Sequence, residues 1–188
     1  MFLVISAPSG AGKTTIIKEI FKLFPNFKFS VSATTRKKRD KEQNGKDYYF
    51  LRKEEFEKRI KNNDFVEWEV VHGEYYGTLK DELDKAIKIN ADIVLDVDVK
   101  GAISIKKLYP DSVTIFINAP RDEIIERLKN RKSESEAEMQ NRIERIDMEF
   151  GLKNNFDYVV NNETKPDGIN EAVGEMKKII EKKLKYKH

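Results

Sequence analysis

Nine residues, Ala7-Pro8-Ser9-Gly10-Ala11-Gly12-Lys13-Thr14-Thr15, connect an expected strand to an expected helix. The apolar run Phe2-Leu3-Val4-Ile5 precedes them and predicts a buried strand. Apolar residues at helical spacing begin at Ile16, and Pro25 ends that helix. A strand, a glycine-containing loop and a helix that starts with Lys-Thr form the arrangement of a phosphate-binding loop.

The residue types of this loop suit phosphate chemically. Glycines allow backbone N–H groups to turn toward phosphate oxygens, and the helix N-terminus adds partial positive charge. We expect Lys13 to reach the β- and γ-phosphates and the Thr14 hydroxyl to hold Mg²⁺. One departure is Ala7, which stands where the usual G-x-x-x-x-G-K-[ST] pattern has its first glycine. The alternative, an ordinary turn that contains Gly-x-Gly-Lys-Thr, is weakened by the flanking strand and helix.

Composition excludes several classes of protein. Of the 188 residues 39% are apolar, enough for one domain with a real core, and 36 basic residues nearly balance 33 acidic ones. The net charge of +3 is a weak argument for nucleic acid binding. The chain has no cysteine, and its two histidines, His72 and His188, are too far apart to form a metal site alone. No apolar run is long enough to cross a membrane, and no signal peptide precedes the first strand, so we expect a cytoplasmic protein.

A basic loop follows the second expected strand, residues 27–31. It reads Ser32-Ala33-Thr34-Thr35-Arg36-Lys37-Lys38-Arg39 and combines hydroxyl groups with positive charge. Two interpretations stay open: a solvated run of charge, or a phosphate site placed just after a strand.

The stretch 65–71 alternates in polarity as a strand does. Val66, Trp68 and Val70 share one face, and we expect Trp68 to lie in the core. Glu67 then points away from the core, to water or into a pocket. Residues 73–78 are expected to form a turn.

The run 93–99 predicts a parallel strand that is covered on both faces. Asp96 and Asp98 are two residues apart, so we expect both side chains on one face near the carboxyl end of this strand. Ligands bind at that end of open α/β sheets, and a carboxylate there typically accompanies Mg²⁺ in phosphate-loop proteins. The alternative is a pair of carboxylates that face solvent.

Arginines recur on two helices joined by a polar segment. Arg127 and Arg131 are one turn apart on the first helix, and Arg142 and Arg145 are three apart on the second. Such a helical pair is typical of a lid, whereas exposed ion pairs with Glu144 or Glu149 are the plainer interpretation, which we favour for Arg145.

Together the pattern predicts an α/β fold: a five-stranded parallel sheet with two inserted lobes in a single domain, residues 1–188. The expected core comprises 1–32, 89–125 and 152–188. The inserted strand-rich lobe comprises 33–88, and the helical lid 126–151.

The motifs resemble those of guanylate kinases, a family of P-loop nucleoside monophosphate kinases, across essentially the whole chain. Besides the phosphate loop, the resemblance rests on Ser-Ala-Thr-Thr-Arg-x-x-Arg (32–39), Asn-Gly-x-Asp-Tyr (44–48), Phe-Val-Glu-Trp (65–68), Tyr-Tyr-Gly-Thr (75–78) and Leu-Asp-Val-Asp-x-x-Gly (95–101).

The resemblance implies phosphorylation of GMP, and of dGMP, by Mg-ATP in purine nucleotide metabolism. It places the guanine on Ser32, Glu67, Thr78 and Asp98, and the GMP phosphate on Arg36, Arg39, Tyr48 and Tyr76. It places the ATP phosphates and Mg²⁺ on the loop residues 7–15 with Asp96, Arg127, Arg131 and Arg142, and the adenine beside Asn161. The expected catalytic residues are Lys13, Arg36, Arg39, Arg131 and Arg142, with Thr14 and Asp96 as metal ligands. A second departure is Lys132, where many members of the family carry glycine.

These expectations leave two alternatives. One is a guanylate-kinase-like module that binds a protein partner and has lost catalysis, and the other is a kinase for another phosphorylated acceptor. Nucleic acid and membranes are not expected as partners, and the chain is expected to be a monomer or a small homo-oligomer.

Overall fold

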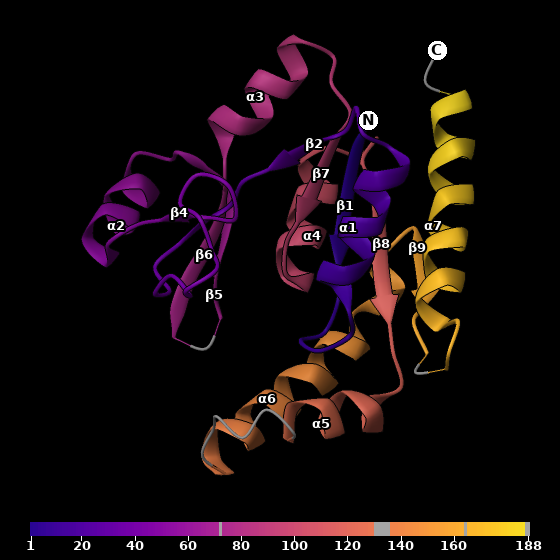
Figure 1. Cartoon of the computed structure of the whole chain (residues 1–188). Coiled ribbons are helices and arrows are strands. Elements are labelled where there is room, and N and C mark those ends of the chain that lie inside the picture. Colours follow the sequence, from indigo (N-terminus) through magenta and orange to yellow (C-terminus); the bar gives the residue numbers. More distant parts are fainter. Residues whose placement is uncertain (72, 130–135, 164, 187–188) are drawn as a thin grey trace. The chain divides into compact units, whose positions relative to one another are not determined.

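The computed structural model describes residues 1–71, 73–129, 136–163 and 165–186, and its main sheet has five strands (Figure 1). Neighbouring strands follow the order β2-β7-β1-β8-β9. Their bounds are β1 Phe2–Ser6, β2 Lys28–Ser30, β7 Ile93–Asp96, β8 Val113–Asn118 and β9 Tyr158–Asn161. The parallel register pairs Phe29 with Val94 and Phe116 with Val159. The predicted α/β class with a five-stranded parallel sheet is confirmed.

The chain divides into two compact units, of which the first contains residues 1–4 and 27–113. This unit carries a smaller mixed sheet in the order β4-β3-β6-β5. Its elements are β3 Ala33–Thr34, β4 Tyr49–Phe50, β5 Phe65–Val71, β6 Glu74–Leu79, α2 Lys53–Lys61, α3 Lys80–Lys88 and α4 Val99–Leu108. Phe56 of α2 stacks on Phe65 of β5 with ring centroids 4.3 Å apart, and both are buried. This aromatic pair anchors the helix on the sheet.

Two expectations for this small sheet are wrong. Residues 74–78 belong to strand β6 rather than to a turn, since the aromatic pair Tyr75-Tyr76 extends antiparallel along β5 and only Gly73, at φ +80°, has turn geometry. Trp68 is 44% exposed rather than buried. Phe56 and Phe65 already fill the core, and the pairing shifts between Phe65 and Glu67, so Trp68 packs on the Tyr75 ring at the margin.

The strand β7 ends at Asp96, so Asp96 and Asp98 do not share a strand face as expected. Asp98 is instead the N-cap of α4, and its Oδ1 accepts a hydrogen bond of 2.7 Å from the N–H of Gly101. Aspartate is a preferred N-cap residue because its carboxylate satisfies helix N–H groups that have no partner within the helix. Capping therefore ended the strand earlier than the apolar run indicated.

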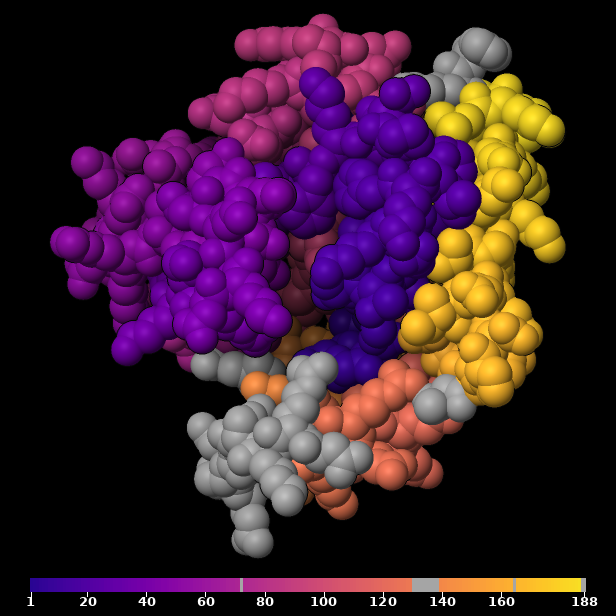
Figure 2. Space-filling model, in the orientation of Figure 1, coloured from indigo at the N-terminus to yellow at the C-terminus, as the bar shows by residue number. Residues whose placement is uncertain are grey.

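The second unit contains residues 5–26 and 114–188. Its helices are α1 Lys13–Leu23, α5 Arg121–Lys129, α6 Glu136–Gly151 and α7 Gly168–Lys185, with a 3₁₀ turn at Lys153–Asn155. Helices α1 and α7 pack side by side (Figures 1 and 2). Ile16 and Ile20 of α1 and Met176 of α7 are buried. Within the described ranges, no helix has both the length and the apolar character needed to span a bilayer.

Candidate active site

The phosphate loop adopts the conformation that its glycines permit. Gly10 and Gly12 have φ values of +93° and +89°, in the left-handed region that disfavours side chains. Ala7 is buried and is not among the described residues with positive φ, so alanine fits where the motif usually has glycine. Gly12 is the N-cap of α1, whose first turn reads Lys13-Thr14-Thr15. The loop therefore presents a helix N-terminus together with a lysine and a threonine.

Two side chains from distant parts of the second unit hold this loop. The buried Asn162 donates from Nδ2 to the carbonyl of Ala11 at 2.7 Å. Arg127 donates to the carbonyl of Gly10 at 3.0 Å and forms an ion pair with Glu123 at 3.2 Å. Each bond fixes one loop carbonyl, and the N–H of Ala11 donates to the carbonyl of Pro8 at 3.1 Å within the loop. Backbone N–H groups that turn inward in such a loop suit anions.

Sequence reasoning did not assign Asn162 to the loop, and the expected place of its neighbour Asn161 beside the adenine stays a prediction. The structure places Asn161 at an exposed position, where its Oδ1 accepts from Nδ2 of Asn118 at 2.7 Å. The signal for Asn162 was the strand alternation itself, because consecutive residues leave β9 in opposite directions.

In the first unit, Glu67 and Thr78 meet across β5 and β6. The fully buried Thr78 donates from Oγ1 to Oε1 of Glu67 at 2.6 Å. Burial is the main cause that raises the pKa of Glu67 to about 7; the Thr78 hydrogen bond opposes this shift and the nearby charge of Asp98 contributes to it. Glu67 also lines a pocket of about 290 Å³ together with Val66, Trp68 and Ser104, among others.

Ser32 and Asp98 lie close to this pair in the fold of the first unit. The register of β3 on β6 pairs Ala33 with Gly77, so the buried Ser32 follows next to Thr78. A side chain at Gly101 would touch the carboxylates of both Glu67 and Asp98. The structure thus brings together the four residues that the resemblance assigned to guanine.

The residues expected to bind the acceptor phosphate form a second group in the same unit. The Arg36 guanidinium lies 5.5 Å from the centroid of the Tyr48 ring, and the rings of Tyr48 and Tyr76 are 6.0 Å apart. Burial raises the pKa of the Tyr48 hydroxyl. The side chain of Arg36 is only 18% exposed, so the basic loop is not simply a solvated run of charge.

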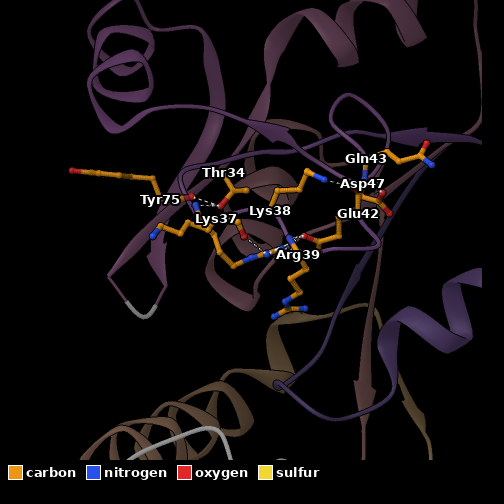
Figure 3. A network of polar contacts seen from close by, with 9 residues as sticks. Thr34, Lys37, Lys38, Arg39, Glu42, Gln43, Asp47 and Tyr75 are labelled. Atoms are coloured by element: carbon orange, nitrogen blue, oxygen red, sulfur yellow. Dashed lines mark hydrogen bonds and ion pairs between the residues drawn. The ribbon is translucent and has the colours of Figure 1, made fainter.

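Glu42 is the residue of this group that sequence reasoning missed. Its two carboxylate oxygens accept hydrogen bonds from the two terminal nitrogens of the Arg36 guanidinium at 2.7 and 3.0 Å. The carboxylate also accepts the backbone N–H of Arg39 at 2.8 Å; Glu42 and Arg39 are labelled in Figure 3. The Arg36 hydrogen bond holds the pKa of Glu42 below its ordinary value, and Glu42 raises that of Arg36. Arginine forks bind carboxylate and phosphate in the same bidentate way, so Glu42 occupies Arg36 as an anion would. The only indication of this role in the sequence was the position of Glu42, an acidic residue three positions after Arg39.

The remaining predicted residues have separate outcomes. Asp96 closes β7, and Arg142 lies half-buried on α6, but Arg131 and Lys132 fall outside the described residues. Arg145 pairs with Glu149 at 2.9 Å, which confirms the expected partner, but Glu149 is buried, so the pair is not the exposed one that was expected. Among the described residues, no cluster of three or more acidic, histidine or cysteine side chains could hold a metal by itself.

The second unit carries a glycine loop on a helix N-terminus, and the first unit carries the carboxylate and arginine residues. These features define the class of P-loop nucleotide-binding proteins. The chain matches the guanylate kinase family over residues 1–183. It is 46% identical to a guanylate kinase of Thermotoga maritima over 90% of this chain and 83% of that protein. A guanylate kinase of Chlorobium luteolum is likewise 46% identical, over 91% and 87%. The crystal structure of guanylate kinase from Anaplasma phagocytophilum matches with a TM-score of 0.75 and 29% identity, covering 96% of this chain and 84% of that one. This chain belongs to the guanylate kinase family.

Proposed function

We propose that this protein transfers the γ-phosphoryl group of Mg-ATP to GMP, and to dGMP, with the phosphate loop binding ATP and the lobe of residues 33–88 receiving GMP. The observation that carries most weight is the Glu67 carboxylate, which lies beside Thr78 and the N-cap Asp98. Guanine offers N1–H and N2–H₂ donors for carboxylates and an O6 acceptor for a hydroxyl.

The same group would reject adenine. Adenine has an unprotonated N1 and no 2-amino group, so the carboxylate of Glu67 would face a lone pair. A buried polar group left without a partner costs about 1–3 kcal/mol, and sites built on such hydrogen bonds discriminate strongly.

On the ATP side, Lys13 would contact the β- and γ-phosphates. Residues 126–151 would form a lid whose cations are Arg127, Arg131 and Arg142. The hydroxyl of Thr14 and the carboxylate of Asp96 are oxygen donors of the kind Mg²⁺ takes, and Mg²⁺ typically needs few protein ligands beside phosphates and water. The bound ion would neutralise phosphate charge. The remainder of the chain, 1–32, 89–125 and 152–188, forms the core, and a cytoplasmic location is proposed because ATP and GMP are available there.

The chemistry requires no general base. The attacking oxygen of the GMP phosphate is already anionic, so the residues act by alignment and by stabilising charge on the transferred group. Arg36 and Arg39 orient the acceptor phosphate, while Lys13 and the loop N–H groups hold the donor.

The test measures ADP release from Mg-ATP with GMP, AMP, CMP and UMP offered separately. Turnover with GMP alone is the expected result. Turnover with a different acceptor would retain the kinase and reject the guanine site. No turnover despite measurable GMP binding would favour a protein-binding module of the same fold.

A further inference from the structure

Gly101, the third residue of α4, lies against the carboxylates of Glu67 and Asp98. With Ser32 and Thr78 these two residues make up the set proposed to bind guanine, called the guanine group below. The N–H of Gly101 donates to Oδ1 of Asp98 at 2.7 Å. A Cβ atom built on Gly101 would stand 2.6 Å from Oε2 of Glu67 and 2.9 Å from Oδ1 of Asp98. Real Cβ atoms do not approach other heavy atoms so closely, so either the carboxylates or the helix would have to move.

Backbone conformation does not explain a glycine at this position. Gly101 is helical and buried, and it is not among the described glycines with positive φ. Inside a helix, glycine costs about 1 kcal/mol relative to alanine. The space that glycine leaves is therefore what distinguishes this residue from alanine.

We propose that Gly101 is a positioning residue for acceptor specificity, because its missing side chain lets the carboxylate of Glu67 reach the first turn of α4 beside Asp98. This inference rests on the proposed function, in which both carboxylates bind guanine. Thr78 holds Glu67 on one side at 2.6 Å. Gly101 forms the opposite wall, and the helix N-terminus favours negative charge there.

The direction of the clash predicts what a side chain would do. Glu67 Oε2 and Asp98 Oδ1 are ends of flexible side chains, so a methyl group at position 101 displaces the carboxylates and leaves the helix in place. Displacing a recognition group by about 1 Å can cost about 100-fold in efficiency. The loss should fall on the acceptor nucleotide and not on ATP.

The experiment compares wild type with Gly101→Ala and a matched control, Gly174→Ala, in the kinase assay. Gly174 also lies inside a helix, α7, and a Cβ there would meet nothing within 4 Å. For Gly101→Ala we expect KM for GMP to rise about 100-fold, with kcat and KM for ATP changed by less than about threefold and the preference for GMP over AMP reduced. Gly174→Ala should behave as wild type.

A double variant separates positioning from simple packing. Glu67→Asp shortens the side chain, so the carboxylate at position 67 no longer lies against residue 101 and only the contact with Oδ1 of Asp98 remains. Adding Gly101→Ala should then cause a much smaller loss than it does in wild type. This coupling is read from a double-mutant cycle on KM for GMP, with melting temperatures measured in parallel.

Three results would overturn the inference: KM and selectivity of Gly101→Ala within about twofold of wild type, losses that add in the double variant, or an equal loss on GMP and ATP together with a lowered melting temperature. Wild type is run in the same assay. If wild type itself shows no turnover with GMP, the proposed function fails. If wild type turns over GMP and Gly101→Ala does so with unchanged KM for GMP and unchanged selectivity, only the role of Gly101 fails.

Discussion

The phosphate loop and the guanine group are built in different ways. The loop uses the main chain of nine consecutive residues, and its geometry depends on positive φ at Gly10 and Gly12. The guanine group uses side chains from positions 32 to 98, which lie before β3, on β5, on β6 and at the N-cap of α4.

This difference separates two kinds of recognition. Main-chain N–H groups and a helix N-terminus suit phosphate, which is common to all nucleotides. Only side chains with distinct donors and acceptors distinguish one base from another. We therefore expect changes in the loop to affect catalysis with every acceptor, and changes in the lobe to affect the choice of acceptor.

Lys13→Ala should have the largest effect, because Lys13 is the only charged side chain in the loop. We expect kcat to fall by about 1,000-fold or more with all acceptors, since one lost donor to the transferring group typically costs about 100- to 1,000-fold and Lys13 also carries charge. The measurement is steady-state ADP release, with circular dichroism to verify folding. Lys18→Ala, on the exposed side of the same helix, is the control. Near-normal turnover of Lys13→Ala would refute the loop assignment.

Glu67→Gln should change selectivity instead. We expect the GMP-to-AMP ratio of kcat/KM to fall about 100-fold, with KM for ATP unchanged, because the amide replaces one carboxylate acceptor with a donor. Glu69→Gln is the control, since Glu69 lies on the same strand and pairs with the half-exposed Lys100 at 3.6 Å. An unchanged ratio in Glu67→Gln would contradict the guanine assignment.

KM for GMP should depend on pH through Glu67, with a smaller effect than that of Glu67→Gln on selectivity. In the proposed complex, the guanine donors require the ionised form of Glu67, whose pKa is about 7 without GMP. As pH falls below 7, KM for GMP should therefore rise by about tenfold per pH unit. The phosphate of GMP also titrates, near about pH 6, and Glu67→Gln retains only that component. The prediction fails if wild type and Glu67→Gln give the same pH profile for KM.

The raised pKa of Glu67 also determines how the free energy of unfolding changes with pH. Folding raises the pKa of Glu67 above its ordinary value of 4.5, so between about 4.5 and 7 the folded state binds more protons than the unfolded state. Without GMP, this carboxyl group therefore stabilises less as pH rises through that range. Chemical denaturation at pH 5 and pH 7.5 should show this difference in wild type and not in Glu67→Gln.

Asn162→Ala should have the smallest effect on activity. It tests whether the buried Asn162 side chain holds the phosphate loop in place. Removing the buried donor leaves the carbonyl of Ala11 without this partner, which should lower the free energy of unfolding by about 1–3 kcal/mol and raise KM for ATP severalfold. Asn155→Ala removes an exposed bond to the carbonyl of Leu152, so its unfolding free energy should match wild type. Equal stability of both variants would show that the bond from Asn162 does not hold the loop.

The parts that sequence reasoning predicted correctly depend on local patterns. The central strands read as apolar runs because both faces of a parallel sheet are covered. The phosphate loop could be recognised as a motif because its residues are consecutive in the sequence. The predictions for Trp68 and residues 74–78 were wrong because the environment of these residues depends on which aromatic rings occupy the small core. Phe56 and Phe65 occupy it, and local sequence does not show this.

The sequence by itself determined the family, the parallel α/β class and the residue types proposed to bind phosphate and guanine, because these depend on periodicity and on short motifs. Only the tertiary structure decided that Glu42 binds Arg36, that Asn162 holds the loop, and that Gly101 leaves room for two carboxylates. Each of these depends on atoms brought within about 3 Å by folding, and a hydrogen bond or a steric contact exists only at that range.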